Sequence, residues 1–250
     1  MAKELTWDGT LSPNEFQKAA KAFVQKWKGC ISMPAWAWKP FTRLPYTLTH
    51  DEGGYLSLEI VYKHVAEERS CDCIVQEGYP LESSALAEEV ADAATLVNLF
   101  ALLSLLMALK CKVLDCDTET HLYDFHIIYS ASYRVPILYF RGYNIGGQPL
   151  DWSTIKEDLP LSSVKMLDES RWTFITKEEH PYLKRPWFTL HPCGTGDWMK
   201  LLFLDKVASV GRAACIPNYV LSWLSMVGQA VGLKVPLDLL TEDEHLPVNS

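Results

Sequence analysis

The chain has 250 residues, 48% of them hydrophobic, which is enough to enclose one sizeable core. Lys and Arg number 23 and Asp and Glu number 31, so the net charge is −8, and an acidic chain lacks the basic face that wholesale nucleic-acid binding needs. Seven cysteines, an odd number, and an N-terminus too polar for a signal peptide predict a reducing, cytoplasmic setting.

The first predicted element is a helix with a clear start. Ser12 and Glu15 form a capping box, and Pro13 occupies the first helical position. Apolar residues then recur at helical spacing on one face, namely Phe16, Ala19, Ala20, Phe23, Val24 and Trp27. We expect this face to dock on the core.

Two tryptophans, Trp36 and Trp38, follow in an irregular segment. They point the same way if the chain is extended there. We favour a small cluster beneath a loop over an exposed recognition patch.

Alternation of apolar and polar residues predicts the strands. Residues 55–65 place Leu56, Leu58, Ile60, Tyr62 and His64 on one side, and residues 121–133 place Tyr123, Phe125, Ile127, Tyr129 and Ala131 on one side. Residues 135–143 are apolar on both faces, as in a strand covered on both sides. With a fourth strand near residue 187, we predict one α+β domain over residues 1–250, with a mainly antiparallel sheet of about four strands flanked by helices.

An uncharged run from residue 93 to residue 109 stands out between the strands. Its length is at the lower limit for spanning a bilayer, and the pattern alone does not separate a membrane helix from a buried one. We expect residues 93–114 to be an apolar insertion that packs on the domain or is tethered to it, with a membrane anchor as the alternative. The polar tail, residues 241–250, is expected to be flexible.

The most informative stretch is WFTLHPCGTGDWM, residues 187–199. Its first four residues predict a short strand, which Pro192 ends because proline has no N–H to donate to the ladder. Cys193 follows at the strand exit, and Asp197 is predicted to cap a helix that begins at Trp198. The thiol is therefore expected on an exposed turn between two rigid elements.

Two interpretations of Cys193 follow from this placement. In the reactive one, the helix N-terminus and His191 favour the thiolate, and Gly194 and Gly196 let another backbone approach closely. In the other, Cys193 is buried and inert, which is the commoner fate of a free cysteine.

Three blocks of the sequence resemble a known family. They are YSASYRVPILYFRGYNIGGQPL, EEHPYLKRPWFTLHPCGTGDWM and NYVLSWLSMVGQAVGL. In this order they resemble the autophagy-related protein ten family of atypical ubiquitin-conjugating-type enzymes, which implies a ubiquitin-conjugating-enzyme-like core. The sister family, autophagy-related protein three, shares the His-Pro-Cys triplet, but its long acidic insert is not seen here.

The resemblance implies a thiol relay at Cys193. The cysteine accepts autophagy-related protein twelve as a thioester from the activating enzyme, autophagy-related protein seven, and passes it to a lysine of autophagy-related protein five. No metal or organic cofactor is implied. The alternative is the sister reaction, transfer of a ubiquitin-like modifier to phosphatidylethanolamine, and the apolar insertion leaves a membrane role open.

Typical conjugating enzymes carry His-Pro-Asn before the cysteine, and here Cys193 itself stands in the third position. Another donor must therefore stabilise the oxyanion or orient the lysine. The candidates are Tyr143, Asn144, Thr173 and Thr176. Among these we favour the first two because they end a strand, and the alternative is that both are ordinary turn residues. His191 is interpreted as a structural turn residue rather than a general base.

A cysteine protease and a non-catalytic binding module are two further classes of protein that could carry such a cysteine. A cysteine protease needs a histidine base, and the only histidine after Cys193 is His245, in the tail expected to be flexible. A non-catalytic binding module would keep the fold and lose the reactive thiol.

Overall fold

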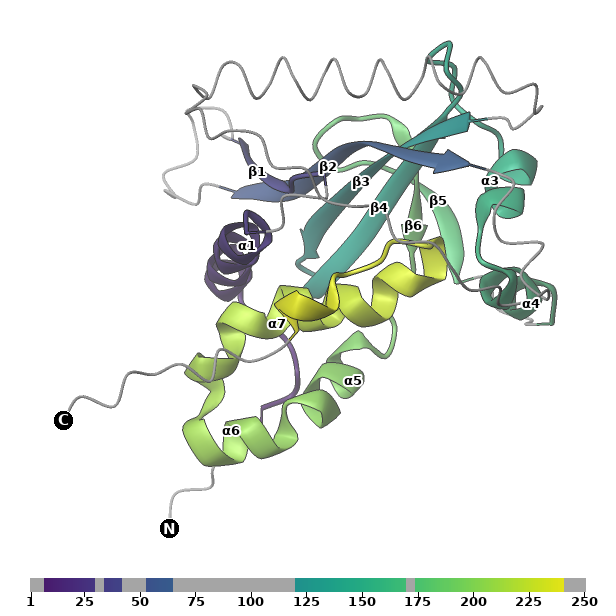
Figure 1. The fold of residues 1–250 in the computed structure, drawn as a ribbon. Helices are drawn as coiled ribbons and strands as arrows, with labels where there is room; N and C mark the ends of the chain where they lie inside the picture. The colour runs from purple at the N-terminus through teal and green to yellow at the C-terminus, as the bar shows by residue number, and fades with distance from the viewer. Residues whose placement is uncertain (1–6, 30–33, 42–52, 65–119, 170–173, 241–250) are drawn as a thin grey trace, which may run out of the picture. The chain divides into compact units, whose positions relative to one another are not determined.

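The centre of the fold is a six-stranded antiparallel sheet (Figure 1). The computed structural model describes residues 7–29, 34–41, 53–64, 120–169 and 174–240. The strands are β1 (Ala37–Phe41), β2 (Gly53–His64), β3 (Thr120–Ser130), β4 (Val135–Tyr143), β5 (Ile175–Glu179) and β6 (Pro186–Leu190), and they lie in the order β1-β2-β3-β4-β6-β5. The α+β class and the antiparallel sheet are confirmed, but the predicted count of four strands was too low.

The two edge strands, β1 and β5, account for the difference in strand count. Each has five residues and is mostly exposed, so neither shows the alternation that marks a half-buried strand. Pro40 also argues against a strand, but it is tolerated in β1 because an edge strand has one side without a partner.

A β-bulge in β2 changes which side chains face the core. The pairing register with β3 shifts between Leu58 and Val61, and Ile60 adopts a positive φ of 60°. The N–H of Ile60 donates to the carboxylate of Asp124 at 3.0 Å. The predicted alternation therefore holds as far as Leu58 and is wrong beyond it, since Ile60 and Tyr62 are exposed and Val61 packs on the core.

The main core lies on one face of the sheet, beneath α1 (Pro13–Trp27) and α7 (Arg212–Val227) (Figure 1). The predicted capping box is present, because the Ser12 hydroxyl accepts the N–H of Glu15 and the Glu15 carboxylate accepts the N–H of Ser12. The predicted apolar face of α1 is buried or packed against the core, as is the face of β3 that carries Tyr123, Phe125 and Ile127. Trp36 also lies in this core, not in a separate cluster, with its ring edge-on to Phe23 and Trp27.

Shorter helices connect the strands and complete the C-terminal part. They are α3 (Trp152–Asp158), α4 (Leu161–Glu169), α5 (Thr195–Leu202), α6 (Leu204–Val210), and the 3-10 helices η1 (Gly228–Val231) and η2 (Leu237–Leu239). Asp151 caps α3 as its side chain accepts the N–H of Thr154 at 3.0 Å. Asp197 does not cap α5, because that helix begins at Thr195 and Asp197 lies in its first turn.

A smaller cluster of Ile128, Tyr139 and Trp187 covers the other face of the sheet. It encloses two hydrogen-bonded histidines, His126 and His180. His180 Nδ1 accepts the N–H groups of Tyr182 and Leu183, so its proton is on Nε2 and points at His126 Nδ1, 2.8 Å away. Burial lowers the pKa of His126 to about 3, with His180 as a further cause, and lowers the pKa of His180 to about 4. Both rings are therefore neutral at physiological pH.

The first prediction concerns the uncharged run. The predicted insertion, residues 93–114, lies outside the described residues, and among the described helices none is long and apolar enough to cross a bilayer. The described strands before and after this run are β2 and β3, and the last residue of β2, His64, pairs with the first residue of β3, Thr120. Deletion of residues 98–114 is therefore expected to leave a soluble, folded protein. Size-exclusion chromatography and circular dichroism measure this, and an insoluble product would show that the deleted residues belong to the core.

The second prediction is an acid-sensitive stability that comes from His126 and His180. Unfolding restores ordinary histidine pKa values near 6.5, so below that pH the unfolded chain binds protons that the folded chain excludes. The free energy of unfolding should hold its full value above pH 6.5 and fall by roughly 1–2 kcal/mol per pH unit towards pH 5.

Urea denaturation at pH 7, 6 and 5 measures the change of the unfolding free energy with pH. These pH values lie above the range where ordinary carboxyl groups titrate. The variant His126→Asn should reduce the slope by roughly half, since one of the two groups is removed. Equal unfolding free energies at pH 7 and pH 5 in the parent would contradict the assignment.

Candidate active site

Cys193 lies on an exposed turn between β6 and α5. The strand ends at Leu190, and Pro192 and Cys193 form the link to the helix. Cys215, the other cysteine among the described residues, is buried in α7, and burial raises the pKa of its thiol. The predicted exposure of the Cys193 thiol between two rigid elements is confirmed.

His191 holds the turn on which Cys193 lies. Its Nδ1 accepts the backbone N–H of Cys193 at 3.2 Å, so a neutral His191 carries its proton on Nε2. The rings of His191 and Tyr133 are in edge-to-face contact, with centroids 5.8 Å apart and planes at 76°. These contacts are what a turn-stabilising histidine makes.

Two glycines after Cys193 shape the start of α5. Gly194 is the N-cap residue with a φ of +77°, a conformation that side chains other than glycine rarely adopt. A Cβ on Gly196 would lie 3.3 Å from the carbonyl oxygen of Asp8 and 3.4 Å from the side chain of Thr10. A close backbone approach is therefore present at Gly196, and the approaching backbone is the chain's own N-terminal segment, whereas Gly194 has the side chain of Trp198 beside it.

An exposed apolar surface adjoins the thiol. Trp198, Leu201 and Leu202 lie on one side of α5 at helical spacing, and each is more than half exposed, as is Leu204 at the start of α6. The Trp198 ring lies against Gly194, the residue that follows Cys193. Clustered exposed apolar side chains are a feature of surfaces that bind other macromolecules.

The structure does not bring Tyr143 and Asn144 to the thiol. Tyr139 on β4 pairs with Thr189 on β6, and because these strands are antiparallel, Tyr143 and Cys193 lie at opposite ends of the pairing. The five residues of strand between Tyr143 and the position opposite Leu190, where β6 ends, already correspond to roughly 16 Å. The side chain of Asn144 accepts the N–H of Gln148 at 2.9 Å, as an ordinary turn residue does.

Of the two threonine candidates, the structure describes Thr176 only. Thr176 on β5 pairs with Thr189 on β6, and their hydroxyls are 3.0 Å apart. Thr189 lies four residues before Cys193 in the sequence. The Thr176 hydroxyl donates to the carboxylate of Glu178, so in its bond with Thr189 it is the acceptor. Thr173 lies outside the described residues.

Tyr133 is an aromatic residue near the Cys193 turn that the sequence analysis did not single out. It lies in the turn between β3 and β4, is 48% exposed, and contacts His191. The only sequence signal is its position two residues before β4, in the turn of a predicted hairpin. Nothing in the local pattern shows which distant loop that turn meets.

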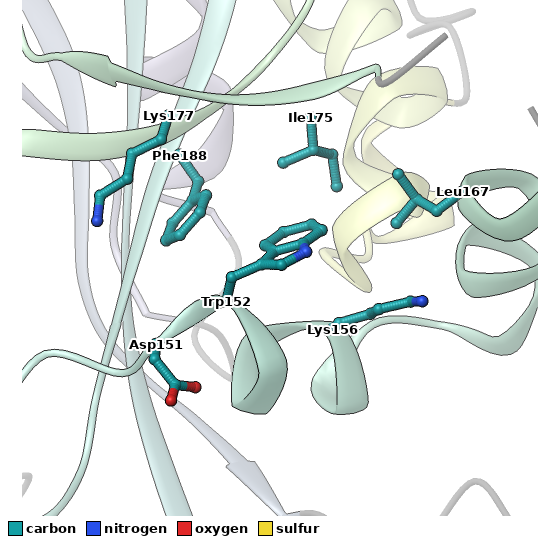
Figure 2. A pocket seen from close by; sticks show the side chains of 7 residues that line it. All are labelled: Asp151, Trp152, Lys156, Leu167, Ile175, Lys177 and Phe188. Atoms are coloured by element: carbon teal, nitrogen blue, oxygen red, sulfur yellow. The ribbon is translucent and has the colours of Figure 1, made fainter. Parts of the chain in front are cut away.

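A separate cavity of about 440 Å³ opens beside α3, α4 and the strands β5 and β6 (Figure 2). Its lining residues are Asp151, Trp152, Lys156, Leu167, Ile175, Lys177 and Phe188. The rings of Trp152 and Phe188 stack with centroids 5.4 Å apart, and Figure 2 shows the ammonium groups of Lys156 and Lys177 on opposite sides of them. No residue of the Cys193 turn lines this cavity. Among the described residues, no three His, Cys, Asp or Glu side chains gather as a metal site would require.

Comparisons with known proteins match this chain over most of its length. A family model described as "Autophagocytosis associated protein, active-site domain" matches residues 15–238. The ubiquitin-like-conjugating enzyme ATG10 of Arabidopsis thaliana is 45% identical over 243 residues, which are 96% of this chain and 98% of that protein. ATG10 of Homo sapiens is 39% identical over 129 residues, 51% of this chain and 57% of that protein. Autophagy-related protein 3 of Candida glabrata is 39% identical over 90 residues, 35% of this chain and 26% of that protein.

These matches define an E2-like enzyme that conjugates ubiquitin-like proteins in autophagy. The similarity to the plant ATG10 runs nearly end to end, whereas the similarity to autophagy-related protein 3 is confined to a minor part of both chains. The chain therefore belongs to the ATG10 family, as the resemblance predicted.

Proposed function

We propose that Cys193 carries autophagy-related protein twelve as a thioester and passes it to a lysine of autophagy-related protein five. In the first step, the Cys193 thiolate attacks the thioester carbonyl on the activating enzyme, autophagy-related protein seven, whose cysteine leaves as a thiolate. In the second step, the neutral lysine amine attacks the Cys193 thioester. An amide bond forms, the amine loses a proton, and Cys193 leaves as a thiolate.

The observation that carries this proposal is the exposure of the Cys193 thiol on a rigid turn. A thiol that must meet one protein thioester and one protein amine has to project from the surface, and Cys215 does not. The apolar residues Trp198 and Leu201 beside it support a protein partner. Neither step requires a metal or an organic cofactor, since one thioester is exchanged for another and then for an amide.

We further propose that the Tyr133 hydroxyl assists the second step, in the role first assigned to Tyr143 and Asn144. Its contact with His191 supports this, because His191 in turn binds the backbone N–H of Cys193. A hydroxyl in this place can donate to the oxyanion that forms when the lysine attacks.

The third prediction assigns the thioester to Cys193. In the variant Cys193→Ser, the modifier should be held as an oxyester, which resists the thiol reductants that cleave a thioester. Incubation with purified activating enzyme, modifier and ATP, read on gels with and without reductant, measures the linkage.

The matched control is Cys215→Ser, which removes a thiol that is buried and is expected to charge like the parent. Loss of charging in Cys215→Ser with normal charging in Cys193→Ser would overturn the assignment. A parent protein that forms no reducible adduct with the modifier would overturn the proposed function itself.

The fourth prediction compares two tyrosines of the same β-hairpin. Tyr133→Phe keeps the ring contact with His191 and removes only the hydroxyl, so discharge of the thioester to the acceptor lysine should slow by about tenfold, below the 10²–10³ typical of an enclosed oxyanion hole. Tyr143→Phe makes the same change at the far end of β4 and should discharge within about twofold of the parent.

Single-turnover discharge of preformed thioester measures both rates. Equal rates in Tyr133→Phe and the parent, with folding intact, would remove this hydroxyl from the mechanism. Slower discharge in Tyr143→Phe than in the parent would show that changes anywhere in the β3–β4 hairpin affect the rate, and that no local donor at Tyr133 is needed to explain it.

A further inference from the structure

Residues 7–11, here called the N-terminal strap, lie between the two parts of the chain that flank Cys193. On one side is the first turn of α5, and on the other is the turn between β3 and β4 that carries Tyr133. Neither contact was predicted from the sequence.

The strap crosses α5 at a point where two backbones nearly touch. A Cβ on Gly9 would lie 1.8 Å from the carbonyl oxygen of Gly196 and 2.7 Å from the backbone nitrogen of Lys200. Gly9 also has a φ of +77°. Any side chain at this position would therefore force the strap away from the helix that follows Cys193.

The strap also binds the β3–β4 turn. The N–H of Leu11 donates to the carbonyl of Arg134 at 2.8 Å, and the Arg134 guanidinium lies 3.5 Å from the carboxylate of Asp8. The hydroxyl of Tyr129, at the end of β3, donates to the carbonyl of Leu11 at 2.7 Å. Because Tyr133 precedes Arg134, these bonds fix the residue that meets His191.

The strap is itself held by the core. The buried hydroxyl of Tyr219 on α7 donates to the carbonyl of Gly9 at 2.7 Å. The Trp7 ring is buried against Phe203 and Tyr219, with centroids about 6 Å apart, and the Arg212 guanidinium lies over it at 5.6 Å. The strap is therefore a rigid link between α7 and the two flanks of the thiol.

We infer that the N-terminal strap is the positioning element of the Cys193 site, and that Gly9 is its key residue. The inference rests on the proposed function of Cys193. Positioning matters here because a displacement of about 1 Å at a reacting group can cost about 10²-fold in rate. The strap is bound to α7 and contacts both the first turn of α5 and the β3–β4 turn, so loosening of the strap displaces these two segments together.

Two variants loosen the strap to different degrees. Gly9→Ala introduces the clash with Gly196 and should slow transfer of the modifier from the activating enzyme by about 10²-fold. Tyr219→Phe removes only the hydrogen bond to Gly9 and should slow it by about tenfold. The matched control is Tyr123→Phe, which also loses one hydrogen bond of a buried tyrosine hydroxyl, here to Asp158. Tyr123 lies at the end of β3 remote from the β3–β4 turn, so this variant should transfer the modifier within about twofold of the parent rate.

Hydrogen exchange and alkylation give readouts that do not depend on activity. In Tyr219→Phe, amide exchange should rise by about tenfold both in peptides covering residues 191–198 and in peptides covering residues 131–134, with no such rise in Tyr123→Phe. Iodoacetamide should leave the buried Cys215 protected in every variant, which separates loosening of the strap from global unfolding.

Joint loosening of the two flanks with slowed transfer supports the inference. Parental transfer in Gly9→Ala overturns it, as does equal slowing in Tyr219→Phe and Tyr123→Phe, which would show a loss of stability only. If the parent itself is never charged, the proposed function fails, while the exchange measurement still decides whether the strap braces both flanks.

Discussion

The close crossing of Gly9 and Gly196 is the contact on which the Cys193 region depends. Two backbones that approach this closely leave no room for a Cβ, so the N-terminal segment and the first turn of α5 hold a fixed distance. From this crossing, hydrogen bonds lead to α7 through Tyr219 and to the β3–β4 turn through Arg134. The turn that carries the exposed cysteine is thus held by contacts with elements far apart in the sequence.

The two faces of the sheet are stabilised by different physics. One face packs the aliphatic and aromatic side chains of α1 and α7, where removal of apolar surface from water is the driving force. The other face encloses His126 and His180, which share one hydrogen bond. The remaining nitrogen of His126 pairs with the hydroxyl of Ser57, and that of His180 accepts the N–H groups of Tyr182 and Leu183. The neutral state of the two histidines makes the second face sensitive to acid, whereas the thiol site on the rim makes no use of these rings.

The site could be predicted only where local chemistry determines it. Pro192 and the glycines that follow show that Cys193 stands on a turn, and the structure confirms its exposure. Tyr143 was chosen because it ends a strand, but the end of a strand does not reveal which end of its partner it meets. The antiparallel register of β4 and β6 puts Tyr143 far away and brings the β3–β4 turn, with Tyr133, to His191.

By itself the sequence determined the elements whose signals are local. These are the capping box at Ser12, the apolar faces of α1 and β3, and the turn that carries Cys193. Only the tertiary structure decided the two edge strands, the bulge after Leu58, and the strap over α5. The physical reason is range: caps and periodicity depend on residues within two helical turns. Register and backbone crossings depend on pairs that may be separated by nearly the whole chain, such as Gly9 and Tyr219, and no local pattern records them.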